Sequence, residues 1–242
     1  MLIACVGRTF QLLDLASGPG EPGCTIAKTF PDINVTITDV SEDQVQLASK
    51  NSCDLQNVTC LVADAQDLGR FQDNSFDVVT NCYGYMFCDD LPAAIRETYR
   101  VLKPGGSLIA TYWLQLPAIA LARAALGAAL TAPPPPPNID PLTLSQPGFF
   151  PSMLQKEHFV DITTSASQYP LDSGASPEDA FVVGTLVVRA QLADIPSTEA
   201  QIRAQNAFWE AWERSEHCNR REDGVYTIGG NIFEMVLARK QK

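Results

Sequence analysis

The chain has 242 residues, of which 45% are hydrophobic and 19% are charged, so it can form a sizeable core and is not expected to be disordered overall. Its formal net charge is −11. Nucleic acids and anionic membranes are bound through basic surfaces, which makes both classes of partner unfavourable and leaves a small molecule as the expected ligand.

Strand and helix signals alternate along the first half of the chain. Runs of apolar and β-branched residues predict five strands, at Phe10–Leu15, Val35–Thr38, Val58–Val62, Phe76–Thr80 and Ser107–Trp113. Helices are predicted after Gly23, after the capping box Ser41–Gln44, and over Leu91–Leu102 behind Asp90. Pro104–Gly106 is expected to stop the last of these helices. The alternation predicts a parallel, doubly wound α/β sheet.

The second half of the chain is less regular. Three helices are predicted, at Leu116–Leu130, Pro177–Leu192 and Thr198–His217, and two further strands at Phe159–Ser165 and Asn231–Ala238. The five prolines Pro133–Pro137 predict an extended polyproline II connector. Trp209 and Trp212 are three residues apart and share a helix face, which predicts core packing or a contact in a homodimer.

Cysteine usage and apolar runs bear on the cellular compartment. The seven cysteines form no Cys-x-x-Cys pair and the chain has two histidines, so no metal site is predicted. An odd number of scattered thiols is typical of a reducing compartment, and we expect a cytoplasmic protein. The start Met1–Gly7 lacks the features of a signal peptide, and Ala118–Ala132 is interrupted by Arg123, so neither targeting nor a membrane span is expected.

Three motifs each follow a predicted strand. In Asp14–Gly20 the glycines let backbone approach a ligand, ahead of a helix N-terminus with free N–H groups. Asp39 ends the second strand, where a carboxylate accepts hydrogen bonds from a ribose diol. Asp64 and Ala65 follow the third strand, where adenine would meet a carboxylate and a small apolar neighbour. For a nucleoside that carries an amino acid, the loop can hold the carboxylate and the ribose while Asp14 orients the ammonium group.

A nicotinamide dinucleotide is the alternative ligand for the same loop. Gly18, Gly20 and Gly23 satisfy the Gly-x-Gly-x-x-Gly fingerprint, and Asp39 satisfies its ribose-binding acid. Against this interpretation, Asp14 would place a carboxylate beside the negative charge of a pyrophosphate, and two prolines crowd the loop. A NAD-binding oxidoreductase is therefore the less favoured hypothesis.

Five segments between Phe10 and Trp113 resemble, in order and spacing, the class I S-adenosylmethionine-dependent methyltransferases. They are Asp14–Gly20, Asp39–Ser41, Ala63–Ala65, Asp73–Val79 and Arg100–Gly106. The likeness is closest to the branch that contains the ubiquinone/menaquinone C-methyltransferases and many small-molecule methyltransferases. It implies a Rossmann-like, three-layer α/β/α fold, with a doubly wound seven-stranded sheet that is mostly parallel and has an antiparallel strand seven.

The resemblance also implies a cofactor, S-adenosyl-L-methionine, with S-adenosyl-L-homocysteine as its product. The cofactor would lie across the carboxyl ends of the strands, against Asp14, Ala16, Gly18, Pro19, Gly20, Asp39, Val40, Asp64, Ala65, Asn81 and Tyr83. We expect a single domain over 1–242, with a cofactor-binding half at 1–113, a variable substrate segment at 114–158, and C-terminal strands and helices at 159–242.

The chain departs from this family at its N-terminus. Few residues precede the first strand, whereas family members usually carry N-terminal helices that close over cofactor and substrate. Closure of the pocket is expected to come from the C-terminal half or from a second subunit. A shortened sequence would show the same departure.

Aromatic residues surround the expected reacting centre. Tyr83, Tyr85, Tyr112 and Trp113 are candidates for an aromatic wall that favours the sulfonium charge, and the last three are candidate substrate contacts. Core packing is the equally weighted alternative for each of them. His158 is expected to be a surface or capping residue rather than a base, and no catalytic residue is assigned.

Two functions remain open at this point. The favoured one is an enzyme that methylates a small molecule at O, N, S or C by in-line displacement; it lacks the Asn-Pro-Pro-Tyr motif of amide and nucleobase N-methylation. The other is a non-catalytic partner subunit or sensor that keeps the cofactor fold, motivated by the missing N-terminal helices.

Overall fold

The computed structural model of the protein describes residues 9–130 and 140–242, so the predicted polyproline segment Pro133–Pro137 lies outside the described residues. The chain divides into two compact units. Unit 1 comprises Met1–Tyr112, Thr143–Ser165 and Glu234–Lys242, and unit 2 comprises Trp113–Leu142 and Ala166–Phe233. The expectation of a single domain over 1–242 stays a prediction.

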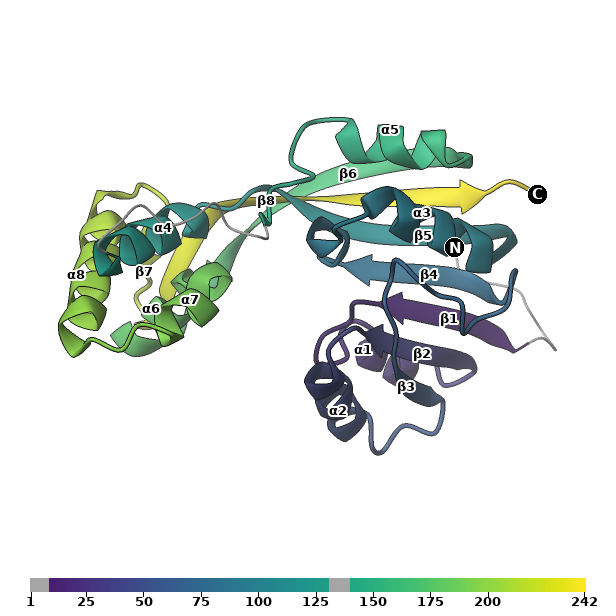
Figure 1. Ribbon diagram of the computed structural model, residues 1–242, viewed down its shortest axis with the longest axis horizontal. Coiled ribbons are helices and arrows are strands. Elements are labelled where there is room, and N and C mark those ends of the chain that lie inside the picture. The colour runs from purple at the N-terminus through teal and green to yellow at the C-terminus, as the bar shows by residue number, and fades with distance from the viewer. Residues whose placement is uncertain (1–8, 131–139) are drawn as a thin grey trace. The chain divides into compact units, whose positions relative to one another are not determined.

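The strands of unit 1 build the sheet that the alternating pattern predicts. They are β1 (Phe10–Leu15), β2 (Ile33–Asp39), β3 (Val58–Val62), β4 (Phe76–Cys82), β5 (Leu102–Gln115), β6 (Phe159–Asp172) and β8 (Tyr226–Lys240), the last three continuing into unit 2. Their order is β3-β2-β1-β4-β5-β8-β6, and the pairs from β3 to β5 are parallel (Figure 1). The predicted doubly wound α/β fold is thereby confirmed.

The final strand runs against its neighbours, as the resemblance implied. Lys240, at the end of β8, donates to the carbonyl oxygen of Leu102, at the start of β5. In Figure 1 the arrowhead of β8 points opposite to those of β1 and β4. An eighth, short strand, β7 (Cys218–Arg220), pairs antiparallel with β8 and was not predicted, because three residues give no periodicity to detect.

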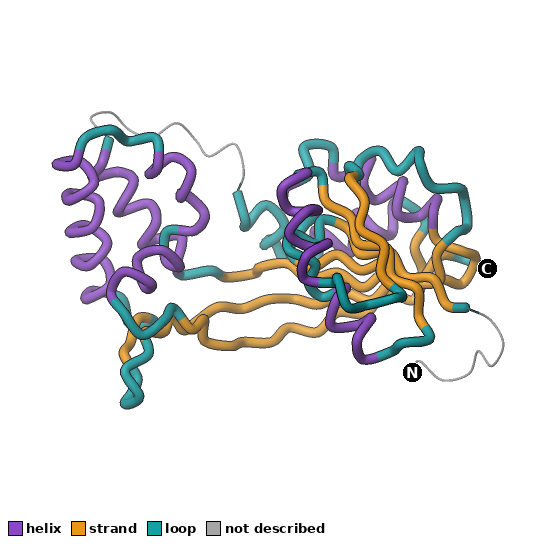
Figure 2. Tube along the Cα trace, turned by 90° about the horizontal axis from the view of Figure 1, so that it is seen from below, coloured by secondary structure: helices purple, strands orange, loops and turns teal. Residues whose placement is uncertain are grey.

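Helices cover both faces of the sheet in unit 1 (Figure 2). They are α1 (Gly23–Thr29), α2 (Glu42–Asn51), α3 (Leu91–Val101), α5 (Phe149–Lys156) and the short 3-10 helix η1 (Tyr85–Phe87). The capping signals work as predicted, since Ser41 accepts from the N–H of Gln44 and Asp90 accepts from that of Ala93. Helix α5 was missed.

The helix predicted before Pro104–Gly106 ends earlier than the sequence suggested. Helix α3 stops at Val101, and β5 already begins at Leu102. Proline and glycine therefore do not stop the helix; they fall inside a strand. The register passes from Phe76↔Leu102 to Val78↔Ser107, so the intervening residues form an irregularity, and Gly105 has a φ of +77°.

Unit 2 is mainly helical. It contains α4 (Ala118–Ala129), α6 (Pro177–Gly184), the 3-10 helix η2 (Leu186–Val188), α7 (Arg189–Ala193) and α8 (Thr198–Arg214). The prediction of one continuous helix over Pro177–Leu192 is thus wrong, because α6 ends at Gly184 and η2 and α7 follow as separate elements. The predicted strands at Phe159–Ser165 and Asn231–Ala238 are confirmed, and both extend further.

The core of unit 2 is aromatic and alanine-rich. Phe208 of α8 is fully buried and contacts the rings of Phe181, Trp209 and Trp212, and Tyr226 contacts both tryptophans. The two tryptophans therefore belong to the core, which is one of the two roles predicted for them. Within the described residues, no helix is long and apolar enough to cross a membrane.

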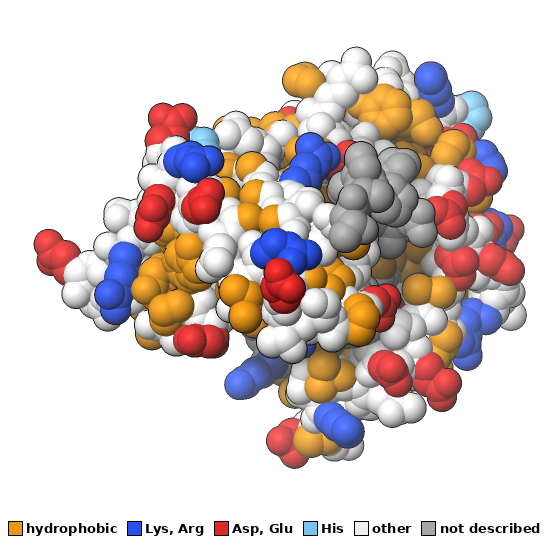
Figure 3. Space-filling view, turned by 60° about the vertical axis from the view of Figure 1, so that its left-hand side comes forward, with side chains coloured by type: hydrophobic (Ala, Val, Ile, Leu, Met, Phe, Trp, Pro, Cys, Tyr) orange, Lys and Arg blue, Asp and Glu red, His pale blue; other side chains and the backbone are white. Residues whose placement is uncertain are grey.

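Surface charges of both signs are interspersed on the face in Figure 3. Carboxylates outnumber the basic side chains in the sequence, with 28 against 17. This face carries no continuous basic field of the kind that nucleic-acid binding uses.

Candidate functional site

The predicted cofactor residues of unit 1 lie together where the parallel strands end. Leu15 of β1 is in register with Asn81 of β4, and Asp39 of β2 with Val62 of β3. The N–H of Ser17 donates to the carbonyl of Thr38 at 2.9 Å, which ties the loop after β1 to the end of β2. Ligands of parallel α/β sheets bind at this carboxyl edge.

Asp14 is the centre of this edge and is completely buried. One carboxylate oxygen accepts from the hydroxyl of Ser17 at 2.5 Å and the N–H of Gly23 at 2.9 Å, while the other accepts from Thr80 at 2.6 Å. Burial raises the pKa of Asp14 to about 6, against the lowering effect of these hydrogen bonds. Its carboxylate thus holds the loop and the two strands, rather than facing a ligand as the sequence suggested.

The loop after Asp14 is shaped by backbone conformations that favour glycine. Gly18 and Gly20 have φ values of +55° and +107°, and Ala16 also lies in the left-handed region at 51°. A Cβ on Gly20 would come within 2.8 Å of the sulfur of Cys24. The carbonyl of Pro19 accepts from the side chain of Asn51. The loop therefore keeps bare backbone at the sheet edge.

Asp39 connects the loop to the helix that follows it. One carboxylate oxygen accepts from the N–H of Gly18 at 2.9 Å, and the other accepts from the N–H of Ser41 at 2.9 Å. A carboxylate offers about four lone-pair positions, so each oxygen of Asp39 keeps one for an external donor. Val40 follows with 69% of its surface exposed, at the same strand end.

Asp64 and Ala65 lie beyond β3, where a third residue joins them. Ala65 is buried, and Asp64 accepts from the backbone N–H of Gln66 at 2.8 Å. The side-chain amide of Gln66 donates to both oxygens of Asp64, and its own oxygen accepts from the N–H of Asp90. Gln66 thereby fixes Asp64 to the start of α3. Apart from its position two residues after the aspartate, no sequence pattern indicates this role of Gln66.

Asn81 and Gly84 fix the turn after β4. Asn81 is buried; its amide donates to the carbonyl of Leu15, and its oxygen accepts from the N–H groups of Gly84 and Tyr85. A Cβ on Gly84 would approach the Asn81 amide to 2.5 Å and the Cβ of Ala16 to 2.7 Å. These side chains lock the β4 turn against the glycine loop, which explains why Asn81 sits at this position.

Tyr83 and Cys82 lie at the same edge, next to the end of β5. Tyr83 has a φ of 57°, and its N–H donates to the carbonyl of Thr111 at 3.1 Å. The Thr111 hydroxyl lies 3.4 Å from the sulfur of Cys82. Burial raises the pKa of the Cys82 thiol, so this group stays protonated near neutral pH.

The predicted aromatic contacts are distributed differently from a single wall. Tyr85 is buried and its hydroxyl pairs with Thr98 of α3, and Tyr112 is 2% exposed with its ring edge-on to Phe150 of α5. Both therefore pack in the core of unit 1, which is the alternative that the sequence left open. Trp113 belongs to unit 2, where its ring lies 6.0 Å from that of Tyr169.

A cavity of unit 1 lies elsewhere on the sheet. This cavity of about 1160 Å³ is lined by Phe10, Leu12, Ile26, Val78 and Ile109, among others, and none of the predicted cofactor residues lines it. The candidate site is therefore defined by converging polar groups at the strand ends and not by this cavity. His158, exposed at the end of α5, contacts the ring of Tyr99, in keeping with the expected surface role.

Residues 13–110 match the family model of a methyltransferase domain. The ubiquinone/menaquinone biosynthesis C-methyltransferases UbiE of Rickettsia bellii (strain OSU 85-389) and Rickettsia prowazekii (strain Madrid E) are 41% and 39% identical over 106 residues. These matches cover 41% of the chain and 42% of each relative, so the similarity spans about two fifths of either protein.

Solved structures share the fold over almost the whole chain. The YcgJ protein of a Bacillus has a TM-score of 0.62 at 16% identity, covering 97% of this chain and 94% of that one. The [4+2]-cyclase SpnF has a TM-score of 0.59 at 21% identity, covering 96% and 75%. Strand order and these solved structures show a Rossmann-like fold, and residues 13–110 are similar to the methyltransferase domain family.

Proposed function

We propose that the chain binds S-adenosylmethionine at the carboxyl edge of β1 to β4 and transfers its methyl group to a small-molecule acceptor. The observation that carries this proposal is the pair of hydrogen bonds by which Asp39 joins Gly18 to Ser41, because it presents carboxylate oxygens beside bare loop backbone. The relatives named as C-methyltransferases support the reaction class.

The residues present fit the cofactor, with one change of role. Asp39 would accept from the ribose hydroxyls, and Asp64 would accept from the adenine amino group beside Ala65. Asp14 already receives three hydrogen bonds and has no exposed surface. It would act as a positioning residue for the loop, and backbone groups of that loop would meet the amino-acid end.

When bound, the cofactor supplies an electrophilic methyl group on a sulfonium. The protein would align the acceptor with that methyl and exclude water, and its acidic surface favours a small acceptor over a nucleic acid. A cytoplasmic location and a homodimer remain further expectations of this proposal.

Calorimetry tests the cofactor assignment. S-adenosylmethionine and S-adenosylhomocysteine should bind with micromolar affinity while NADH does not. Asp39→Ala should weaken binding of both at least tenfold, since it removes the ribose acceptor and a loop hydrogen bond. Asp54→Ala, an exposed carboxylate in the same unit, is the matched control and should leave affinity unchanged. Equal affinity in the Asp39 variant would overturn the ribose contact.

A non-catalytic cofactor-binding subunit is the second candidate. The fold is shared with a protein described as a [4+2]-cyclase, so this architecture alone does not determine methyl transfer. Transfer of labelled methyl from S-adenosylmethionine to a panel of hydroxylated aromatic acceptors separates the two. Binding without any transfer would favour the subunit.

A further inference from the structure

A carboxylate of β8 lies in the aromatic core of unit 1. The hydroxyl of Tyr112, on β5, donates to a carboxylate oxygen of Glu234. The ring of Tyr112 is edge-on to Phe150 at 5.2 Å, and Phe150 also contacts Tyr85 at 5.4 Å. Tyr112 is buried, whereas Glu234 is only half-buried. An aromatic neighbourhood therefore holds a carboxylate that solvent or a ligand can still reach.

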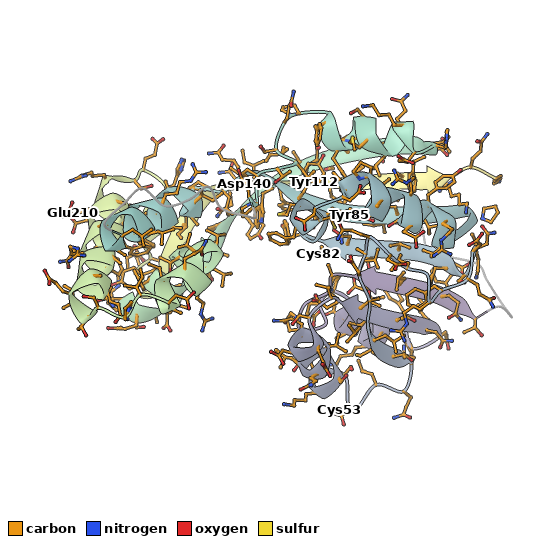
Figure 4. The ribbon with its side chains drawn as sticks, viewed as in Figure 1. Cys53, Cys82, Tyr85, Tyr112, Asp140 and Glu210 are labelled. Atoms are coloured by element: carbon orange, nitrogen blue, oxygen red, sulfur yellow. The ribbon has the colours of Figure 1, made fainter. Side chains whose placement is uncertain are left out.

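The pair lies at the edge where the candidate site is. Thr111 is in register with Cys82, and its carbonyl accepts from the N–H of Tyr83, a predicted cofactor contact. Tyr112 is the next residue of β5, so it lies at the carboxyl end of the strand that neighbours β4. Figure 4 shows Cys82, Tyr85 and Tyr112 at this same end of the strands.

The two groups have fixed hydrogen-bonding roles. Burial raises the pKa of Tyr112, and the neighbouring carboxylate raises it further, so the phenol stays protonated and donates. Glu234 is then the acceptor, and one hydrogen bond leaves most of its lone-pair positions open. The hydroxyl of the other nearby tyrosine, Tyr85, is engaged with Thr98. Glu234 thus has capacity for a second donor.

An exposed aromatic side chain lies on η1, the 3-10 helix that also holds Tyr85. Phe87, in η1 four residues after Tyr83, is 48% exposed, although it is a large apolar residue. Exposed aromatic rings of this kind stack on ring-shaped ligands, which favours an aromatic acceptor.

We propose that Glu234 is the proton acceptor for a hydroxyl group on an aromatic acceptor, with Tyr112 as the residue that positions it. This inference rests on the proposed function. In the step, the acceptor O–H bond breaks, the proton forms an O–H bond to Glu234, and the electron pair stays on the acceptor oxygen. That pair makes the oxygen the nucleophile: its bond to the methyl group would form as the methyl–sulfur bond breaks, and S-adenosylhomocysteine would leave with the sulfur electron pair. The Glu234 proton then passes to water.

Binding of 4-nitrocatechol tests the proposal without turnover, because its phenolate absorbs visible light. A carboxylate stabilises the neutral hydroxyl and repels the phenolate. Nitrocatechol bound to the wild-type chain should therefore ionise about one pH unit or more above the free compound. Glu234→Gln keeps an acceptor for Tyr112 but removes the charge, and should abolish this shift.

Two further variants complete the experiment. Tyr112→Phe removes the hydroxyl that positions the carboxylate and should reduce the shift without abolishing it. Glu157→Gln, which changes a carboxylate just after α5 that faces Arg96, should retain the full shift. Nitrocatechol that fails to bind to the wild type, or ionises there as it does free in solution, overturns the proposal even if the Glu234 variant does not fold. A retained shift in Glu234→Gln overturns it as well.

S-adenosylhomocysteine binding separates this inference from the function on which it rests. Normal binding with no nitrocatechol shift would remove the role of Glu234 and leave the cofactor site standing. A shift without S-adenosylhomocysteine binding would remove the proposed function. In turnover, Glu234→Gln should lower kcat about 100-fold, as expected for loss of a general base, with unchanged cofactor affinity.

Discussion

The carboxyl edge of unit 1 is stabilised by polar contacts, whereas the core of unit 2 is stabilised by apolar contacts. At the edge, buried polar side chains such as Asp14 and Asn81 accept from and donate to named backbone groups. In unit 2, α4 and α8 meet through alanines and aromatic rings. Directional contacts demand particular residue types, whereas apolar packing tolerates exchange at similar volume. The family match ends at residue 110, before unit 2 begins.

The largest expected effect comes from removing apolar packing in the core of unit 2. Phe208→Ala removes a fully buried ring that contacts Phe181, Trp209 and Trp212, and should lower the free energy of unfolding by about 3–5 kcal/mol. Urea unfolding measures the loss, and calorimetry on the folded protein should show unchanged S-adenosylhomocysteine affinity. A tenfold drop in affinity would mean that the core of unit 2 also sets the geometry of the cofactor site.

The second effect concerns Asp14, the buried carboxylate at the carboxyl edge of unit 1, and depends on pH. The pKa of Asp14 is raised from 3.8 to about 6, which corresponds to about 3 kcal/mol of differential stabilisation. The raised value means that its contribution to stability is present below pH 4 and is lost as pH rises through 6. Relative to Asp14→Asn, which does not titrate, the wild type should lose about 3 kcal/mol between pH 4 and pH 7.5.

Urea unfolding at several pH values checks this difference. Asp54→Asn, at an exposed position, should follow the wild type within a few tenths of a kcal/mol at every pH. Parallel stability curves for the wild type and Asp14→Asn would contradict the prediction. Asp14→Asn should also weaken cofactor binding at neutral pH, because an amide cannot accept from Ser17, Gly23 and Thr80 together.

A smaller effect concerns the clamp at the end of β8. The ammonium group of Lys240 donates to the carbonyls of Arg100 and Leu102 and lies 4.9 Å from the centroid of the Tyr99 ring. Lys240→Met removes both hydrogen bonds, although the carbonyl of Arg100 keeps the N–H of Asn74, and should cost about 1–2 kcal/mol in urea unfolding. Lys242→Met, two residues further and exposed, should be neutral. Equal free energies of unfolding for the two variants would show that the Lys240 hydrogen bonds do not stabilise the fold.

The smallest effect is a negative control for unit 2. Arg214 pairs with Glu210 one turn earlier on α8, but both side chains are mostly exposed, at 79% and 64%. Arg214→Ala should therefore change the free energy of unfolding by less than about 0.5 kcal/mol. A loss above 1 kcal/mol would show that surface ion pairs contribute to unit 2 and that its apolar packing is not sufficient.

The strands of unit 1 were predictable because short apolar runs are separated there by glycine, aspartate and proline. Phe10–Leu15 and Val58–Val62 begin and end as the pattern predicts. The convergence of Asp39 and the glycine loop followed from parallel topology alone. What the sequence did not reveal is which carboxylate faces outward, since Asp14 and Asp39 look alike in sequence but differ in burial and in the number of donors they receive.

Contacts between residues far apart in the chain could not be predicted from the pattern of apolar residues either. Tyr112 and Glu234 are 122 residues apart, and only the placement of β8 beside β5 brings them together. Helix α5 has eight residues with a proline at its third position, too short for a period of 3.6 to stand out. The close approach at Gly184, where α6 ends, is a further long-range contact, because a Cβ there would meet the ring of Phe208 at 2.5 Å.

The tight turn at Gly84 has a consequence for how this protein can change over generations. Because Ala16 and Asn81 leave no space for a Cβ there, a mutation at position 84 is tolerated only when one of these partners has changed first. Positions 16, 81 and 84 should therefore change together among descendants of this chain. Reversing one of them without the others should disrupt the turn. Ancestral reconstructions would find the order of these changes constrained.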